Sequence, residues 1–256
     1  MLLAIDVGNT QTVFGLRSGE NWLGQWRVAT EPERTADELA VLVDRLLALR
    51  DHSIEDVKAA CLSSTVPVLV REYKTFAESY LNTQVLIVGP GVRTGIPILV
   101  DDPREVGPDR IANSVAALET YGAPCVVVDF GTATNFDVVS QEGEYIGGAI
   151  APGIETSMEA LFSRAARLVK VDFVAPPNPV GRNTVHALQS GFVFGFAGQI
   201  DGVVGRIRSE IGQEARVIST GGLAGLVAPY SDTIELVDAN LTLEGLRIVW
   251  DRNQEV

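Results

Sequence analysis

The apolar positions of this chain follow two different periods, one typical of strands and one typical of helices. Residues 2–16 hold an apolar run and then an alternating run, separated by a turn at Gly8 and Asn9, which predicts a pair of strands. Residues 35–50 carry leucine and valine at helical spacing behind Thr35, a residue suited to cap a helix. The same criteria predict further strands at 22–29, 57–62, 84–88, 124–130, 136–139, 145–150 and 215–220, and further helices at 67–81, 108–122, 153–167, 184–211 and 241–250.

Strands and helices that alternate along a chain are typical of the α/β class. The run PCVVVDF at 124–130 is almost continuously apolar, which indicates a strand buried on both faces of a sheet. The most proline-rich stretch, APPNPVG at 175–181, is too short to be a flexible linker between domains. We therefore expect it to be a loop inside the second half of the chain.

One motif occurs twice, at corresponding points of the two halves of the chain. Asp6–Thr10 (DVGNT) ends the first strand, and Asp129–Ala133 (DFGTA) ends another strand 123 residues later. A match in motif, in strand context and in half-chain spacing predicts a duplication. Residues 1–115 and 116–256 would then form two similar α/β domains that face each other across a cleft, and each would contribute one aspartate to it.

Composition narrows the range of functions. The chain has 256 residues, of which 46% are hydrophobic, and it carries a net charge of −13 with its basic residues scattered. This balance argues against nucleic acid as a partner, because phosphate backbones are bound by clustered basic residues. None of the lysines, at positions 58, 74 and 170, follows a glycine, so a Walker A loop is excluded.

Several features predict a cytoplasmic protein that has no membrane partner. Cys61 and Cys125 lie in apolar runs, where a thiol usually packs as a small core residue. The N-terminus, MLLAID, lacks the basic region and the length of a signal peptide. No apolar run reaches the roughly 18 residues that a membrane-spanning helix needs.

The two Asp-x-Gly loops have the chemistry of a phosphate site. Glycine lets the backbone approach an anion, amide and hydroxyl groups donate to its oxygens, and the aspartate can hold a cation. Gly221 and Gly222 follow a strand at a sheet edge where α/β folds place ligands, and they admit a flat group such as an adenine. Residues 147–153 (GGAIAPG) are interpreted as another loop of exposed backbone at a helix start, where anions are favoured. The alternative is that the Asp-x-Gly turns are purely structural.

The order of these motifs resembles the type III pantothenate kinase family over essentially the whole chain. The resemblance rests on five segments: Asp6–Thr10, Gly107–Arg110, Asp129–Thr134, Gly147–Gly153 and Ser219–Gly222. It implies the superfamily of acetate kinases, sugar kinases, Hsp70 and actin, and hence two duplicated ribonuclease-H-like (actin-like ATPase) domains around a nucleotide cleft. It also implies ATP-dependent phosphorylation of pantothenate to 4′-phosphopantothenate, the first step of coenzyme A biosynthesis, by a homodimer.

The resemblance assigns roles to individual residues. Asp109, at a helix start, corresponds to the general base that takes the proton of the attacking hydroxyl, a role compatible with the physics of phosphoryl transfer. Asp6 is expected to organise Mg²⁺, directly or through water, and Asp129 to bind a monovalent cation, K⁺ or NH₄⁺. The residues expected to contact ATP are Asp6, Val7, Gly8, Asn9, Thr10, Gln11, Thr12, Val13, Thr132, Gly221 and Gly222. Those expected to contact pantothenate are Gly107, Pro108, Asp109, Arg110, Thr184 and Val100.

Some of these residues also have structural interpretations. Asp109 could cap its helix with Arg110 as an ion-pair partner, and Thr184 could cap the helix that follows it. The resemblance places Thr184 at pantothenate, across a dimer interface. Many family members have a tyrosine where this chain has Val100, so the pocket is either reshaped there or completed by another group.

Two other functions stay open on the sequence alone. One is a non-catalytic regulatory or accessory protein on the same scaffold, and the other is a kinase of the same superfamily that acts on a sugar or an acid. Retention of Asp6, Asp109, Arg110 and Asp129 argues against the accessory protein, which has no need of a base. Asp137 is a fourth candidate carboxylate. A chain this negative must recruit positive charge locally to bind two anionic substrates, from Mg²⁺, a monovalent cation, Arg110 and backbone amides.

Overall fold

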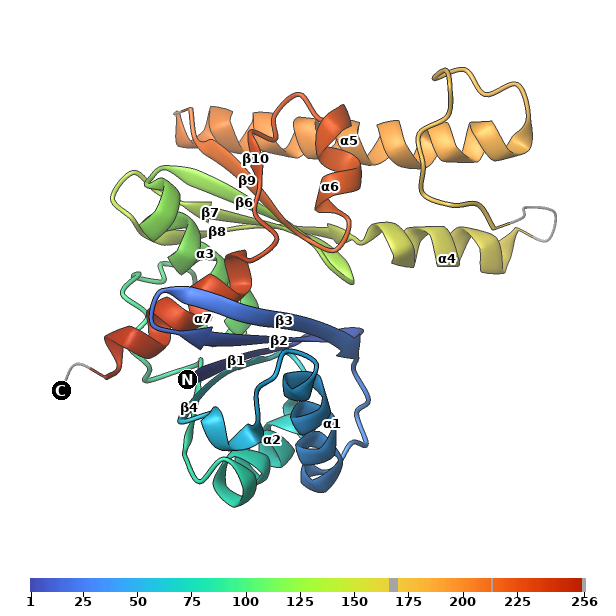
Figure 1. Cartoon of the computed structure of the whole chain (residues 1–256). Coiled ribbons are helices and arrows are strands. Elements are labelled where there is room, and N and C mark those ends of the chain that lie inside the picture. The colour runs from blue at the N-terminus through green and yellow to red at the C-terminus, as the bar shows by residue number, and fades with distance from the viewer. Residues whose placement is uncertain (166–169, 213, 255–256) are drawn as a thin grey trace. The chain divides into compact units, whose positions relative to one another are not determined.

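The computed structural model describes residues 1–165, 170–212 and 214–254, and it contains two five-stranded sheets in two compact units (Figure 1). The first unit holds Met1–Ile96, Asp101–Ala116 and the chain from Leu241 onward, and the second holds Pro97–Val100 and Ala117–Asn240. The sequence predicted a division after residue 115. The boundary between the units falls one residue later, after Ala116, inside helix α3 (Pro108–Tyr121). The closing helix, although last in the sequence, packs in the first unit.

The first unit is built on a mixed sheet in the order β3-β2-β1-β4-β5. The central strand β1 is antiparallel to β2 and parallel to β4. Apolar residues fill β1 because it is covered on both faces, and all five of the predicted strands of this unit are confirmed. Their bounds are β1 Leu2–Val7, β2 Gln11–Ser18, β3 Asn21–Ala29, β4 Ala59–Ser64 and β5 Val85–Ile87.

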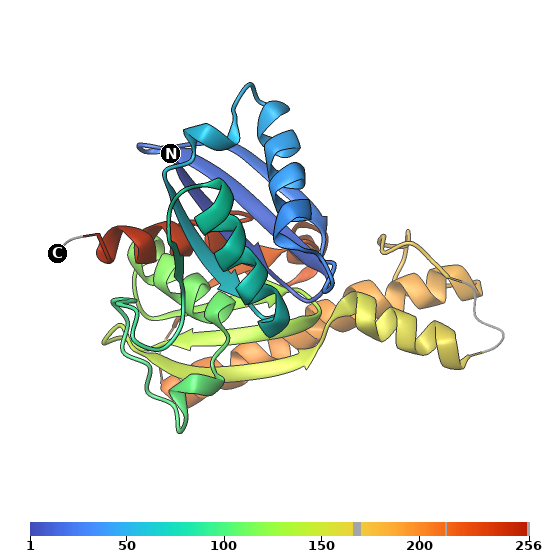
Figure 2. The same cartoon turned by 90° about the horizontal axis from the view of Figure 1, so that it is seen from below.

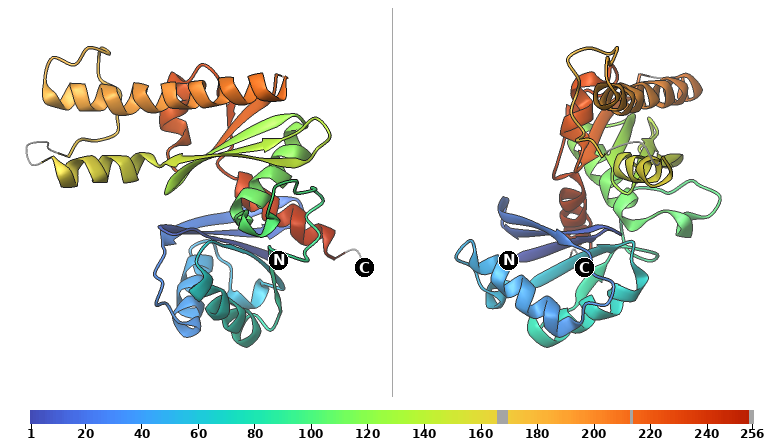
Figure 3. Two further views of the ribbon diagram at one scale, coloured as in Figure 1. Left: turned by 180° about the vertical axis from the view of Figure 1, so that it is seen from behind. Right: turned by 90° about the vertical axis from the view of Figure 1, so that its right-hand side faces the viewer.

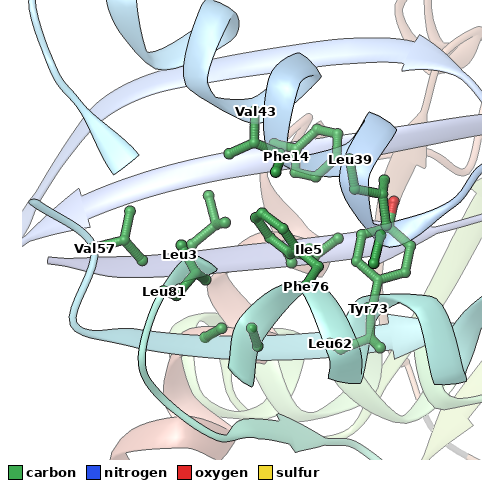
Figure 4. Packing of buried hydrophobic residues seen from close by; sticks show 14 of the residues in the cluster. Leu3, Ile5, Phe14, Leu39, Val43, Val57, Leu62, Tyr73, Phe76 and Leu81 are labelled. Carbon is green, nitrogen blue, oxygen red and sulfur yellow. The ribbon is translucent and has the colours of Figure 1, made fainter. Parts of the chain in front are cut away.

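Two helices, α1 (Ala36–Ala48) and α2 (Pro67–Tyr80), lie side by side on one face of this sheet (Figure 2). Thr35 caps α1 as predicted, in a reciprocal capping box with Glu38. Pro67 begins α2, where its missing N–H costs nothing. Their apolar faces close the core against β1, β2 and β4 (Figure 4); its largest buried side chains include Phe14, Leu39, Leu62, Tyr73 and Phe76.

The other face of the first sheet is covered by α7 (Leu241–Arg252), the closing helix. Leu243 packs on Gly15 of β2, a position where a side chain would collide with it. α7 also crosses the first turns of α3 (Pro108–Tyr121) at close range, because Gly245 lies against the backbone of Ala112. This crossing fixes the start of α3, the helix that carries Asp109.

The second unit repeats this architecture. Its sheet has the order β8-β7-β6-β9-β10, in which β6 is antiparallel to β7 and parallel to β9. Burial raises the pKa of the two thiols, Cys61 on β4 and Cys125 on β6, to about 12, and both are buried as predicted. The strands are β6 Cys125–Phe130, β7 Ala133–Val139, β8 Tyr145–Pro152, β9 Arg216–Gly221 and β10 Leu236–Val237.

Helix α5 (Thr184–Ile211) runs along the second sheet beside α4 (Ile154–Arg164), and a short helix, α6 (Ala224–Val227), follows β9 (Figure 3). Ala197, Ile200 and Val204 of α5 pack on the sheet. The predicted helix at 153–167 ends at Arg164, and residues 166–167 of that prediction lie outside the described residues. Short 3-10 turns complete the described elements, at Ile54–Asp56, Pro103–Glu105 and Ala228–Tyr230.

The shared topology confirms the duplication. Asp6 and Asp129 occupy the same position, next to last in the central strand of each sheet. The hairpin that follows is one residue longer in the first unit, because Val7 pairs with Thr12 whereas Phe130 pairs with Thr134. In both hairpins the glycine N–H donates across the turn, from Gly8 and from Gly131, over 3.0 Å.

One interpretation from the sequence was wrong. Residues 147–153 were interpreted as a loop of exposed backbone, but 147–152 are part of β8 and pair with β7, which confirms the strand predicted at 145–150. Only Gly153 stands before α4, at its N-cap. Glycine occurs in this strand because Gly148 lies so close to the carbonyl of Phe136 that a side chain would collide with it. The two-residue strand β10 and helix α6 were not predicted, since both are too short to show a period.

Candidate active site

Asp6 stands at the carboxyl end of β1, where the hairpin of residues 8–11 turns the chain into β2. Asp6 and Gly8 are half-buried, while Asn9, Thr10 and Gln11 are exposed. The hairpin therefore presents its backbone and short polar side chains to solvent directly after a carboxylate, which is the arrangement that a phosphate-binding turn needs. Gln11 is already engaged, because its Oε1 accepts from Arg27 Nη1 at 2.8 Å.

Thr12 and Val13, also expected to contact ATP, lie on β2. The side chain of Thr12 is buried, and its hydroxyl is 2.8 Å from the Thr30 hydroxyl. Thr30 in turn donates to the carbonyl of Gly8 over 2.8 Å. The structure thus places the Thr12 hydroxyl beneath the hairpin, in its support, rather than on its exposed side.

The sequence analysis did not single out Ser63. It lies directly opposite Asp6 in the parallel pairing of β1 with β4. Its hydroxyl is fully buried and has no hydrogen-bond partner among the described residues. The carboxyl ends of neighbouring parallel strands lie at the same edge of a sheet. The polar pair Ser63-Ser64, directly after an apolar run, is therefore the sequence signal that could have identified Ser63.

Asp109 is held in the first turn of α3, next to Gly107 and Pro108. A side chain at position 107 would collide with Asp109 Oδ1, so glycine there leaves room for the carboxylate. The backbone N–H of Arg110 donates to Asp109 Oδ1 over 2.9 Å. Burial raises the pKa of Asp109 above its ordinary value, because the protein replaces water around the charged form; the Arg110 N–H and the Arg110 charge oppose this shift.

In the second unit, Asp129 lies at the end of β6, opposite Thr220 of β9. Gly221 follows with a φ of +92°, and a Cβ built there would lie 2.7 Å from Asp129 Oδ1 and 2.5 Å from the carbonyl oxygen of Phe130. Only glycine fits this close approach. Glycine at 221 thus lets the backbone of β9 end directly beside the carboxylate of Asp129.

Thr132 is exposed in the hairpin after Asp129. Its carbonyl accepts from Gly153 N at 3.2 Å and from the Thr156 hydroxyl at 2.9 Å, which ties the hairpin to the start of α4. A side chain at Gly153 would collide with that carbonyl. Within the 147–153 segment, Gly153 is therefore the glycine that lets α4 approach the hairpin.

Thr184 is exposed at the start of α5 and lines an open pocket of about 440 Å³ with Gly181, Arg182, Asn183, Ala187 and Leu188. The predicted alternative role of Thr184 as the helix cap was wrong. Asn183 is the cap, and its Oδ1 accepts from His186 N at 2.8 Å. The Thr184 hydroxyl is therefore not used for capping.

Val100 lies in a short segment that pairs with β8, through Leu99 N and Tyr145 O at 2.8 Å. Its side chain faces Gly147, where a Cβ would come within 3.7 Å of Val100 Cγ1. Asp137 is fully buried behind this segment and accepts from the Tyr145 hydroxyl at 2.9 Å. Its place in the interior makes Asp137 a structural residue of the sheet rather than a ligand at its edge.

Each of the two strand-end carboxylates, Asp6 and Asp129, is a single candidate ligand for a cation. A bound substrate would have to supply further ligands at each position. Among the described residues, no group of three or more His, Cys, Asp or Glu side chains is arranged to hold a metal ion. Mg²⁺ usually takes one or two protein carboxylates and fills its octahedron with waters and substrate phosphates. A single carboxylate such as Asp6, beside a phosphate-binding turn, has that chemistry.

Comparison with known proteins decides the family. The family model of type III pantothenate kinase matches residues 2–206. The chain belongs to the type III pantothenate kinase family. A type III pantothenate kinase of Myxococcus xanthus is 52% identical over 253 residues, which cover 99% of each chain. Membership confirms the predicted kinase activity, directed at pantothenate in coenzyme A biosynthesis, and gives no support to the accessory-protein alternative.

Solved structures share the fold of this chain. A glucomannokinase from Arthrobacter superposes with a TM-score of 0.51 at 13% identity, over 100% of this chain and 99% of the other. A Campylobacter jejuni protein named for the Baf family of transcriptional activators reaches 0.64 at 19% identity, over 99% and 100%. None of the described helices combines the length and the apolarity that crossing a bilayer requires.

Proposed function

We propose that this protein transfers the γ-phosphoryl group of ATP to the primary hydroxyl of pantothenate, giving 4′-phosphopantothenate and ADP, and that Asp109 is the base. The observation that carries the proposal is the setting of the Asp109 carboxylate. It is half-buried at the start of α3, the space beside it is left by Gly107, and it is oriented by the N–H of Arg110. A carboxylate with that orientation can accept the hydroxyl proton as the oxygen attacks phosphorus.

Around this base, the remaining residues would bind and neutralise charge. The hairpin after Asp6 would hold the ATP phosphates through its amides and hydroxyls, and Arg110 would face the anionic acceptor. Thr132 and the Gly221-Gly222 turn would contribute the second unit's contacts with the nucleotide. Mg²⁺ bound through Asp6 and the phosphates would neutralise the charge that develops on the leaving ADP.

A coupled assay of ADP release tests this function. Purified protein with Mg-ATP should turn over with pantothenate as acceptor and show little release above background with a panel of sugars, acetate and glycerate. Absence of pantothenate-dependent release, both with and without potassium, would overturn the proposal. Faster turnover with a sugar or an acid would favour the other kinase class of the same superfamily.

We expect a monovalent cation at Asp129. Raising K⁺ or NH₄⁺ from zero should increase kcat/KM about tenfold or more, since a cation there replaces positive charge that lysine supplies in P-loop enzymes. Asp129→Asn should abolish this stimulation, while Asp172→Asn, an acid elsewhere in the second unit, should retain it. A wild-type enzyme with the same rate in K⁺ and in a bulky ammonium salt would contradict this role.

We also propose a cytoplasmic homodimer that pairs through α5. Five glycines recur along one face of this helix at alternating intervals of four and three residues, namely Gly191, Gly195, Gly198, Gly202 and Gly205. Four of them are exposed, and a Cβ at Gly191, Gly195, Gly198 or Gly205 would meet no other atom within 4 Å. The pattern continues back to Leu188 and Thr184, so the Thr184 pocket lies at one end of the same face. This supports a role for Thr184 at a dimer interface.

Gly198→Leu should disrupt that dimer, because a large side chain on the glycine face prevents close approach of a second helix. Light scattering after size exclusion should give the mass of a dimer for the wild type and of a monomer for the variant. Glu210→Leu, near the end of the same helix but off the glycine stripe, is the control and should remain dimeric. A monomeric wild type would contradict the homodimer.

A further inference from the structure

Three buried or half-buried hydroxyls form a chain beneath the hairpin of residues 8–11. Thr30, which directly follows β3, donates to the carbonyl oxygen of Gly8 over 2.8 Å. The Thr12 and Thr30 hydroxyl oxygens are 2.8 Å apart. Tyr73, on α2, lies beside Thr12 and interacts with its side chain. The chain therefore runs from the helix layer, through the sheet, to the turn itself.

The direction of each hydrogen bond in this chain follows from counting protons. Each hydroxyl carries one proton. Thr30 uses its proton on Gly8 O, so Thr12 must donate to Thr30. Burial raises the pKa of Tyr73, beside Thr12, to about 12. The protons of Thr12 and Thr30 therefore both point toward the Gly8 carbonyl.

The surroundings of these three hydroxyls hold them in place. Tyr73 and Thr12 are 2% and 1% exposed, and the ring of Tyr73 packs in the core near Leu39 and Leu62 (Figure 4). A buried hydroxyl that loses its partner carries a desolvation cost, so each member is held by its neighbours. The first hairpin is thereby anchored to the buried core of the first unit.

The second unit anchors its hairpin differently. There the carbonyl of Thr132 accepts from Gly153 N and from the Thr156 hydroxyl, both at the start of α4. Thr134, the equivalent of Thr12, has its hydroxyl 3.5 Å from the carbonyl of Pro152. The three-hydroxyl chain thus accompanies the longer of the two hairpins, the one that follows Asp6.

We propose that Thr30 and Tyr73 are positioning residues for nucleotide binding, which act by fixing the Gly8 carbonyl and with it the orientation of the hairpin that receives the ATP phosphates. This inference rests on the proposed function for the identity of the ligand. With the Gly8 carbonyl tied down from below, the peptide plane between Gly8 and Asn9 is restrained from flipping, so the Asn9 amide keeps its direction. Such preorganisation strengthens binding because no ordering cost remains.

The test compares variants that remove one hydroxyl at a time. Thr30→Val should raise KM for ATP about tenfold, the loss expected for one buried hydrogen bond, with kcat and KM for pantothenate nearly unchanged. Tyr73→Phe should give a smaller rise of the same kind, and Thr30→Ser should restore wild-type values. Thr94→Val is the matched control, because Thr94 is a half-buried threonine of the same unit that also donates to a carbonyl, that of Ile96.

Amide hydrogen exchange of residues 8–12 supplies a readout that does not depend on turnover. Exchange there should accelerate in Thr30→Val and Tyr73→Phe but not in Thr94→Val. The inference is overturned if folded Thr30→Val keeps both the wild-type KM for ATP and the wild-type exchange, or if KM for pantothenate rises equally. If Thr30→Val does not fold, a Tyr73→Phe variant with the wild-type KM for ATP and the wild-type exchange overturns the inference. A wild type inactive on pantothenate would refute the proposed function, whereas the exchange data would still decide this inference.

Discussion

Asp109→Asn is expected to lower kcat by about 10²–10⁴-fold, the usual contribution of a general base. Asparagine preserves the shape of the side chain and can still accept from the Arg110 N–H, but it cannot take up the proton of the attacking hydroxyl. KM for ATP should change little, because Asp109 is expected to contact the acceptor. Steady-state kinetics with both substrates varied would measure the effect.

The same substitution should not destabilise the protein. The pKa of Asp109 is raised in the folded state, so its charged form is disfavoured by folding. This cost is absent at a pH below the ordinary pKa of the unfolded chain, grows as the pH rises through the folded pKa, and is fully present above it. The substituted asparagine is uncharged and avoids the cost, so at pH 7 the melting temperature of Asp109→Asn should equal or exceed that of the wild type.

The pH profile gives a further signature of the base. The rate of the wild type should fall on the acid side as Asp109 becomes protonated, at a pH above the ordinary range of an aspartate. The residual activity of Asp109→Asn should lack this acid limb. Asp101 is an exposed acid in the same unit, so Asp101→Asn is the control. This variant should keep both the wild-type rate and the acid limb of the pH profile. Near-normal turnover of a folded Asp109→Asn would show that Asp109 is not the base.

Asp6→Asn should lower kcat/KM by about 10²–10³-fold, because organisation of the metal and phosphates is worth several kcal/mol of transition-state stabilisation. The neutral amide is a poor ligand for Mg²⁺, so the apparent affinity for Mg-ATP should also fall, and excess Mg²⁺ should recover part of the rate. A titration of activity against Mg²⁺ at fixed ATP would separate these effects.

A half-buried acid on α1, Asp44, provides the comparison for Asp6. Asp44→Asn should leave the Mg²⁺ titration unchanged. If Asp6→Asn retains kcat/KM within about fivefold of the wild type and has the same Mg²⁺ titration, Asp6 does not organise the metal. The role of the first hairpin would then have to be structural, as the alternative interpretation of the Asp-x-Gly turns holds.

The fold could be predicted from the sequence to the extent that its elements are long and periodic. The capping box at Thr35, the proline at the start of α2 and the limits of α5 each have a strong local signal. The sequence predicted a strand at 145–150 but not why glycine stands at 148, because that depends on the close approach of Phe136 in the neighbouring strand. Nor could it show that α7 joins the first unit, since that packing joins residues far apart in the chain.

For the candidate site, the sequence identified the residues at strand ends and helix starts but not what holds them. Asp6, Asp109 and Asp129 lie beside glycines that allow close backbone contacts, and those motifs are visible in the sequence. Ser63 and Thr30 were not singled out, because their places beside Asp6 and Gly8 arise from pairing across strands and turns. Thr12 was assigned to the nucleotide, although its hydroxyl lies beneath the hairpin, because sequence spacing alone does not tell the two sides of a turn apart.

The most direct test of the central claim is the identity of the product. Wild-type protein is incubated with Mg-ATP, KCl and pantothenate, and the mixture is analysed by mass spectrometry and ³¹P NMR. We predict one new phosphomonoester, on the 4′-hydroxyl of pantothenate, formed in equal amount with ADP. ADP formed while pantothenate stays unmodified, or no reaction either with or without potassium, would contradict the assignment of this chain as an active pantothenate kinase.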